Sequence, residues 1–167
     1  MTLKDLPVGS IVTDKKTKFN GKPIEWLVAD HNCSNTTLLS KNILCCRPFD
    51  KPKEYYEDEY RKKYGSNRWS TSDLRKWLNN EFFGKSFSSR LAGLTIPVLN
   101  APEIPMRDRG NRNEHMADNT EDNVFLLSAA EIGSEGDSEA IELFKSNNKE
   151  KYRIAEVCPG LAWYWWL

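Results

Sequence analysis

The stretch Ser70–Gly84, STSDLRKWLNNEFFG, carries the clearest secondary-structure signal in the chain. Its apolar residues follow the i, i+3, i+4, i+8 spacing that places side chains on one face of a helix. These residues are Leu74, Trp77, Leu78 and Phe82. Ser70 is a favourable N-cap residue, and Gly84 is a favourable residue at a helix end. We therefore predict a helix over 71–83 whose apolar stripe packs on a core.

Shorter patterns on both sides of this helix predict strands. Residues 8–30 predict a strand, a turn and a strand, because Asn20-Gly21 is typical of a two-residue hairpin turn and apolar residues alternate after it. Further candidates are strands at 36–40, 124–127 and 162–167 and helices near 88–93 and 137–146. Ser128 and Glu131 have the spacing of a capping box. The combination predicts an α+β fold with short, mainly antiparallel strands and two or three helices.

The size and composition indicate a globular chain. Its 167 residues are 39% hydrophobic and 29% charged, which is typical of one domain with a real core. Residues 106–122 lack periodicity and predict a long polar loop within a single domain, 1–167. No apolar run reaches about 18 residues, and the N-terminus has no secretory signal. We expect no membrane span and a cytoplasmic location in a bacterial host.

The cysteines give little support for a metal site. Cys33, Cys45, Cys46 and Cys158 lack the C-x₂-C spacing of zinc sites, so we expect reduced, mostly buried thiols. One of Cys45 and Cys46 is expected in the core. A site built from His31, Cys33 and one of this adjacent pair stays an alternative. No metal and no cofactor are predicted.

Other chemistry has equally weak signals. Asp118, Glu121 and Asp122, with Asn119 and Asn123, could supply oxygen ligands to calcium, but their spacing matches no known loop, and a solvated loop is favoured. The two histidines, His31 and His115, have no nucleophile beside them in a recognisable motif. We therefore predict no catalytic residues.

Charge is distributed unevenly although the net charge is zero. Residues 114–144 contain nine acidic residues and no lysine or arginine. This run is either a solvated loop with polar helix faces or a surface that meets a basic groove. In the basic middle of the chain, acidic residues alternate with Arg61-Lys62-Lys63, so direct nucleic-acid binding is not expected.

Several stretches occur together in the order of one known family. They are Leu6–Ser10 with Gly21–Trp26, Phe49-Asp50, Tyr64–Ser70, Leu74–Asn79, Val124–Ser128 with Glu131, and Trp163–Leu167. In this order the chain resembles a domain of unknown function common in Firmicute genomes and prophages. That family is marked by an S-x-[IL]-R-x-W-L-N helix, an F-L-L-S segment and a W-W-L-R-[ST] strand.

The resemblance implies a C-type-lectin-like scaffold that binds partners and has no catalytic apparatus. In the family, a display half follows the W-W-L strand, whereas this chain ends at Leu167. We therefore expect a C-terminally shortened scaffold whose last aromatic strand completes the core and whose own loops contact the partner.

These observations favour a non-enzymatic protein-binding module of bacterial or prophage origin. The partner is expected to be another protein, such as a nucleic-acid-binding host protein. Predicted partner-binding residues are Tyr55, Tyr56, Tyr60, Arg107, Arg109, Arg112, Glu114, Asp118, Glu121 and Asp122. The main alternative is a phage-encoded inhibitor of a host defence nuclease, of the anti-CRISPR kind, that uses an acidic surface. A metal-dependent hydrolase is the third alternative.

Overall fold

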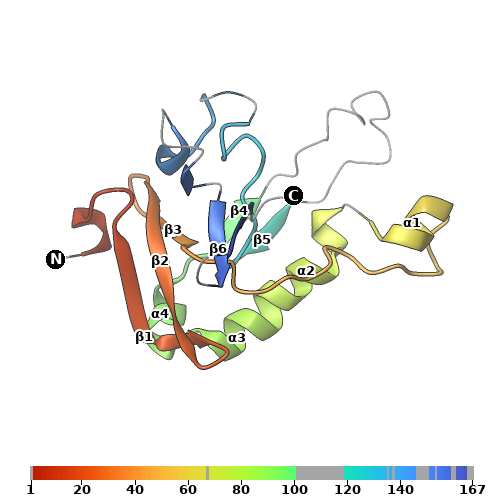
Figure 1. Cartoon of the computed structure of the whole chain (residues 1–167), viewed down its shortest axis with the longest axis horizontal. Coiled ribbons are helices and arrows are strands. Elements are labelled where there is room, and N and C mark those ends of the chain that lie inside the picture. The colour runs from red at the N-terminus through yellow and green to blue at the C-terminus, as the bar shows by residue number, and fades with distance from the viewer. Residues whose placement is uncertain are drawn as a thin grey trace. The chain divides into compact units, whose positions relative to one another are not determined.

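The structure is a computed structural model (Figure 1), and its elements belong to two compact units. It describes residues 2–66, 68–100, 119–134, 136, 138–145, 151–152, 154–158 and 161–164. Unit 1 combines Met1–Cys46 with Leu127–Leu167, and unit 2 is Arg47–Leu126. Short helices and antiparallel strand pairs make the fold α+β, as the sequence predicts. The expectation of one domain over 1–167 stays a prediction.

Unit 1 contains a three-stranded antiparallel sheet in the order β1-β2-β3. Its strands are β1 (Ile11–Phe19), β2 (Lys22–His31) and β3 (Thr36–Ser40), and a 3₁₀ turn, η1 (Leu3–Asp5), precedes them. Asn20 and Gly21 join β1 to β2 with φ angles of 48° and 79°, in the left-handed region that a tight hairpin turn requires. The predicted hairpin turn and the predicted strand at 36–40 are both confirmed, but the first strand of the hairpin, expected from the segment 8–12, instead runs over Ile11–Phe19.

Strand β2 and a short turn supply most of the core of unit 1. Ile24, Val28 and Ala29 on β2 are at most 2% exposed, and Phe144 in the 3₁₀ turn η5 (Glu142–Phe144) is fully buried. Over the described residues 138–145, the helix predicted near 137–146 is wrong, since only the turn η5 is helical there, although Ala140, Leu143 and Phe144 are buried. The reason is that the Ile141 N–H donates to the Glu131 carbonyl (3.0 Å) and is not available for a helical bond.

A second antiparallel pair completes the strands of unit 1. Strand β6 (Ile154–Cys158) pairs with β7 (Leu161–Tyr164), and the Ile43 N–H donates to the Glu156 carbonyl (3.1 Å). Strand β7 confirms the predicted last strand as far as Tyr164, whereas β6 was not predicted. Residues 165–167 and the side chains of the terminal aromatic segment lie outside the described part of the chain.

The predicted capping box is confirmed. The Ser128 N–H donates to Glu131 Oε2 (2.7 Å), and the Glu131 N–H donates to Ser128 Oγ (3.2 Å). It begins a single helical turn that ends at Gly133, which has a φ angle of 68°. The strand predicted at 124–127 is not formed, because the backbone of Val124 bonds to the side chain of Asn79 instead of to another strand.

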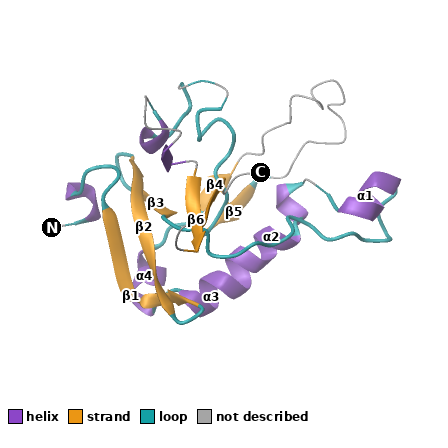
Figure 2. Ribbon diagram, in the orientation of Figure 1, coloured by secondary structure: helices purple, strands orange, loops and turns teal. Residues whose placement is uncertain are grey.

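Unit 2 is built around one continuous helix (Figure 2). The helix consists of α2 (Asp73–Lys76), a π-helical segment (Trp77–Phe82) and α3 (Phe83–Ser86). The 3₁₀ turn η2 (Trp69–Thr71) precedes it, and the other elements of unit 2 are α1 (Glu59–Tyr64), α4 (Ser89–Leu94), β4 (Val98–Asn100) and β5 (Thr120–Asp122). Strands β4 and β5 pair antiparallel. None of the helices in the described residues is long and apolar enough to cross a membrane.

The central helix confirms the predicted helix but not its ends. Ser72, not Ser70, caps it, since Ser72 Oγ accepts the Arg75 N–H (3.1 Å) and Ser70 lies in η2. The helix continues through Gly84 to Ser86, and Phe87 after it packs its ring on Phe82 and Phe83. The short helix predicted at 88–93 is α4. The predicted loop 106–122 ends in β5, and its residues 106–118 lie outside the described part.

Candidate binding site and the contacts that hold it

Asp122 is the centre of a buried polar cluster in unit 2. Its side chain is fully buried and accepts hydrogen bonds from Trp69 Nε1 (2.9 Å), Arg75 Nε (2.7 Å), Asn100 Nδ2 (2.9 Å) and Thr120 Oγ1 (2.7 Å). Burial alone would raise the pKa of Asp122, but these hydrogen bonds and the Arg75 charge lower it. Asp122 was predicted to contact a partner; the structure instead places it inside unit 2, with its carboxylate oxygens occupied.

Asn79 makes a second set of contacts between the central helix and the segment after β5. Its Oδ1 accepts the N–H groups of Asn123 (2.8 Å) and Val124 (3.1 Å), and its Nδ2 donates to the Val124 carbonyl (2.9 Å). This pattern satisfies backbone groups in the way that a neighbouring strand would. The polar residues of the S-x-[IL]-R-x-W-L-N motif therefore have structural roles. Ser72 caps the helix, Arg75 pairs with Asp122, and Asn79 bonds to the backbone after β5.

Asp50 closes the base of a loop in unit 2. Its carboxylate accepts hydrogen bonds from Lys53 Nζ, the Tyr56 hydroxyl, the Ser66 N–H (2.9 Å) and the Asp73 N–H (3.3 Å). Burial opposes ionisation of this carboxyl group, but the hydrogen bonds outweigh it and lower the pKa of Asp50 to about 2. Burial and the Asp50 carboxylate together raise the pKa of Tyr56 to about 12. Asp50 is therefore an ionised anchor.

The loop that Asp50 closes, residues 51–65, is named the tyrosine loop. Gly65 has a φ angle of 82°, and a Cβ there would overlap the carbonyl oxygen of Asp50, so the chain can return to the base only with glycine. Helix α1, capped by Asp58, lies in this loop and projects away from α2 (Figure 2). Tyr55, Tyr60 and Tyr64 are 74%, 70% and 56% exposed.

The structure separates the predicted partner-binding residues by role. Tyr55 and Tyr60 are exposed on the tyrosine loop, whereas Tyr56 is half-buried and supports the loop through Asp50. Glu121 is exposed on β5. Arg107, Arg109, Arg112, Glu114 and Asp118 lie outside the described residues.

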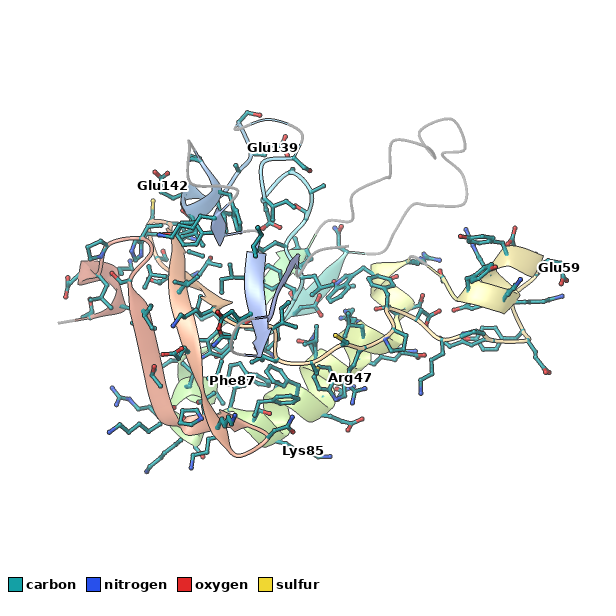
Figure 3. All side chains as sticks on the ribbon, in the orientation of Figure 1. Arg47, Glu59, Lys85, Phe87, Glu139 and Glu142 are labelled. Atoms are coloured by element: carbon teal, nitrogen blue, oxygen red, sulfur yellow. The ribbon has the colours of Figure 1, made fainter. Side chains whose placement is uncertain are left out.

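A pocket of about 280 Å³ lies along the central helix of unit 2. It is lined by Arg47, Pro48, Lys51, Asp73, Leu74, Lys76, Trp77, Asn80 and Glu81. The guanidinium of Arg47 stands over the Trp77 ring at 4.0 Å from its centroid, and Figure 3 shows Arg47 beside the helix. The sequence pattern does not predict this pocket, because the spacing of Trp77 places it in the core-facing stripe of the helix. Trp77 is instead half-buried and forms part of the pocket wall.

A family model described as "Domain of unknown function (DUF6273)" matches residues 34–167. The chain belongs to the DUF6273 family. Comparison with curated proteins and with solved structures found no match in either. The DUF6273 match includes the Asp50 and Asp122 clusters, the tyrosine loop and the pocket lining.

His31 and Cys33 lie just before the DUF6273 match. The His31 ring bonds through Nε2 to the Leu6 carbonyl (2.9 Å) and through Nδ1 to Thr36 Oγ1 (3.0 Å), so it fastens the N-terminal segment to β3. Cys33, Cys45 and Cys46 are exposed, which corrects the prediction of buried thiols; Cys45 and Cys46 lie outside any strand. Across the described residues, no three His, Cys, Asp or Glu side chains are grouped to hold a metal ion.

Proposed function

We propose that this DUF6273 protein is a non-enzymatic protein-binding module and that the tyrosine loop is its contact surface. The observation that carries the proposal is the exposure of Tyr55, Tyr60 and Tyr64 on a loop with a fixed base. Tyrosine combines a large apolar ring with a polar hydroxyl and loses little conformational entropy on binding, which is why it is enriched in protein interfaces.

The base of the loop supports the same proposal. Asp50 receives four hydrogen bonds at the point where the tyrosine loop leaves and returns. The Tyr60 and Tyr64 rings also contact each other, with centroids 4.6 Å apart. A loop that is ordered before binding loses less entropy when a partner docks, so more of the contact energy appears as affinity.

The bacterial or prophage origin and the C-type-lectin-like scaffold belong to the same proposal and derive from the sequence resemblance, and a cytoplasmic location is proposed with them. The alternative of an acidic inhibitor receives less support from the described residues. Among the described acidic residues of 114–144, Asp122 is buried, Glu131 is used in a capping box and Glu142 pairs with Lys145 (3.2 Å), whereas Glu121 and Glu139 are exposed. Contacts through an acidic surface weaken strongly as the salt concentration rises, whereas the apolar contacts of the tyrosine rings do not.

The experiment is capture of a partner from a bacterial lysate by the purified protein and by two variants. One variant replaces Tyr55, Tyr60 and Tyr64 with serine. The matched control is Leu94→Ser, which removes a side chain that is 66% exposed but lies outside the loop. We expect one stoichiometric protein that the control retains and the tyrosine variant loses. Equal capture by both variants would contradict the proposal.

A further inference from the structure

The pocket described above, named the Arg47 pocket, has two walls that are fastened to each other. One wall is the segment 47–51, and the other is the start of the central helix, 73–81. The Leu74 N–H donates to the Phe49 carbonyl (3.0 Å), and the Lys51 N–H donates to Asp73 Oδ2 (3.2 Å). The pocket is thus part of the folded framework of unit 2 and is formed before any ligand arrives.

The charges that line the Arg47 pocket do not cancel. Each of its two acidic residues contacts a cation outside the lining: Asp73 contacts Lys53 (3.2 Å), which it shares with Asp50, and Glu81 contacts Lys85 (3.6 Å). The cations of the lining are Arg47, Lys51 and Lys76. Within the described part of the chain, no carboxylate forms an ion pair with any of these three. A recess with this lining attracts anions.

Arg47 is held in a geometry suited to a carboxylate. Stacking of its guanidinium on the Trp77 ring restrains the side chain and leaves the N–H groups at its edge for a ligand. Arginine binds carboxylates through two parallel hydrogen bonds, and lysines nearby add charge without fixed geometry. Pro48, Leu74 and Trp77 give the same pocket an apolar part.

The helix is irregular where it faces the pocket. Trp77, Asn80 and Glu81 of the lining belong to the π-helical segment Trp77–Phe82. Such segments are rare and occur frequently at functional sites, where they change the direction of side chains that a regular helix would align. The π segment is therefore an independent observation that points to the same place as the unpaired cations.

We propose that the Arg47 pocket binds the carboxylate side chains of an acidic peptide segment on the partner protein, with an adjacent apolar side chain seated on Pro48 and Leu74. This inference rests on the proposed function as a protein-binding module. The pocket volume of about 280 Å³ suits one or two side chains better than a larger cofactor. Arg75 is paired with Asp122 and so does not extend the basic surface beyond the pocket. The three cations of the lining therefore form a local site and not an extended row of charges that could follow the phosphates of a nucleic acid.

The test uses a fluorescein-labelled nine-residue peptide with three glutamates, one leucine and otherwise serine and glycine. Its counterpart has glutamine in place of each glutamate. Binding is measured by fluorescence anisotropy at low salt, and the Trp77 indole N–H is followed by NMR. Arg47→Ala removes the guanidinium and its charge, whereas Arg47→Lys keeps the charge but cannot make two parallel hydrogen bonds. The control, Arg90→Ala, removes an exposed arginine on α4 that does not line the pocket. Lys51→Gln combined with Lys76→Gln tests the pocket independently of Arg47.

We expect the glutamate peptide to bind, the glutamine peptide to bind at least tenfold more weakly, and the Trp77 signal to shift on binding. Arg47→Ala should weaken binding tenfold or more, Arg47→Lys and the double lysine variant several-fold, and Arg90→Ala less than twofold. Equal binding by Arg47→Ala, or displacement of the peptide by equimolar citrate or single-stranded DNA, would overturn the inference. If the unsubstituted protein does not bind the glutamate peptide while tyrosine-dependent capture stays intact, the inference about the Arg47 pocket alone is refuted and the proposed function stands.

Discussion

The substitution Asp122→Asn tests whether the buried cluster holds unit 2 together. It keeps the size of the side chain but removes its charge. In the native protein, Asp122 Oδ2 accepts hydrogen bonds from Trp69, Asn100 and Thr120. The amide oxygen of the new asparagine should take this position, because it is the only acceptor left on the side chain. The new NH₂ group then faces Arg75 Nε, at the 2.7 Å where Oδ1 had accepted a hydrogen bond. Two donors meet, and the guanidinium loses its carboxylate partner and keeps only its hydrogen bonds to the carbonyls of Ser70 (3.2 Å) and Glu121 (3.4 Å).

The expected loss follows from this geometry. Breaking a buried ion pair by removing one partner costs about 3–5 kcal/mol. The Arg75 side chain is 24% exposed and can recover some hydration, so the lower end applies, about 3 kcal/mol. With a urea m value of about 2 kcal/mol/M, the midpoint of unfolding should fall by about 1.5 M.

The assay is urea unfolding at pH 7, followed by tryptophan fluorescence and far-ultraviolet circular dichroism. Glu121→Gln is the matched control, because it removes an exposed carboxylate one residue away, and it should change the free energy of unfolding by less than about 0.5 kcal/mol. A loss below about 1 kcal/mol for Asp122→Asn, with an unchanged m value, would refute the reasoning that this carboxylate is essential to the packing of unit 2.

Three further results are expected. The Asp50 pKa is about 2 in the folded protein and 3.8 in the unfolded chain, so ionised Asp50 contributes roughly 2 kcal/mol to the free energy of unfolding above pH 4. This contribution is lost as pH falls toward 2. Asp50→Asn should lack that loss when the free energy of unfolding is measured as a function of pH. Asn79→Ala leaves the N–H groups of Asn123 and Val124 unsatisfied and should cost about 2–4 kcal/mol in urea unfolding, whereas Asn80→Ala should cost under about 0.5. Phe144→Ala, at a fully buried ring, should cost about 3–5 kcal/mol, and a loss under 1 would place that ring outside the core.

The sequence predicted the elements whose signals are local. The hairpin at Asn20-Gly21, the central helix and the Ser128–Glu131 capping box each depend on residues a few positions apart, and the structure contains all three. The errors fall where distant contacts decide. Strand 124–127 is not formed because its backbone bonds to Asn79, 45 residues earlier, and the helix near 137–146 is reduced to one turn because Ile141 bonds to Glu131.

The candidate sites show the same limit. Tyr55 and Tyr60, which the sequence analysis expects to contact a partner, are both exposed. The interior position of Asp122 could not be predicted, because its donors come from segments as far apart as Trp69 and Thr120. The Arg47 pocket was missed for a similar reason: Trp77 fits the apolar stripe of the helix, and only the structure shows Arg47 above its ring.

The closure at Asp50 has a practical consequence for engineering. Because Ser66 and Gly65 return the chain to the carboxylate and carbonyl of Asp50, the ends of the intervening stretch stay at a fixed spacing whatever lies between them. Residues 57–64 could therefore be exchanged for foreign sequences of other lengths. Lys53 and Tyr56 would be kept, because both donate hydrogen bonds to the Asp50 carboxylate that closes the loop. The additional entropy of closing a longer insert grows only slowly with its length. The molecule thus offers a graft position for peptide libraries.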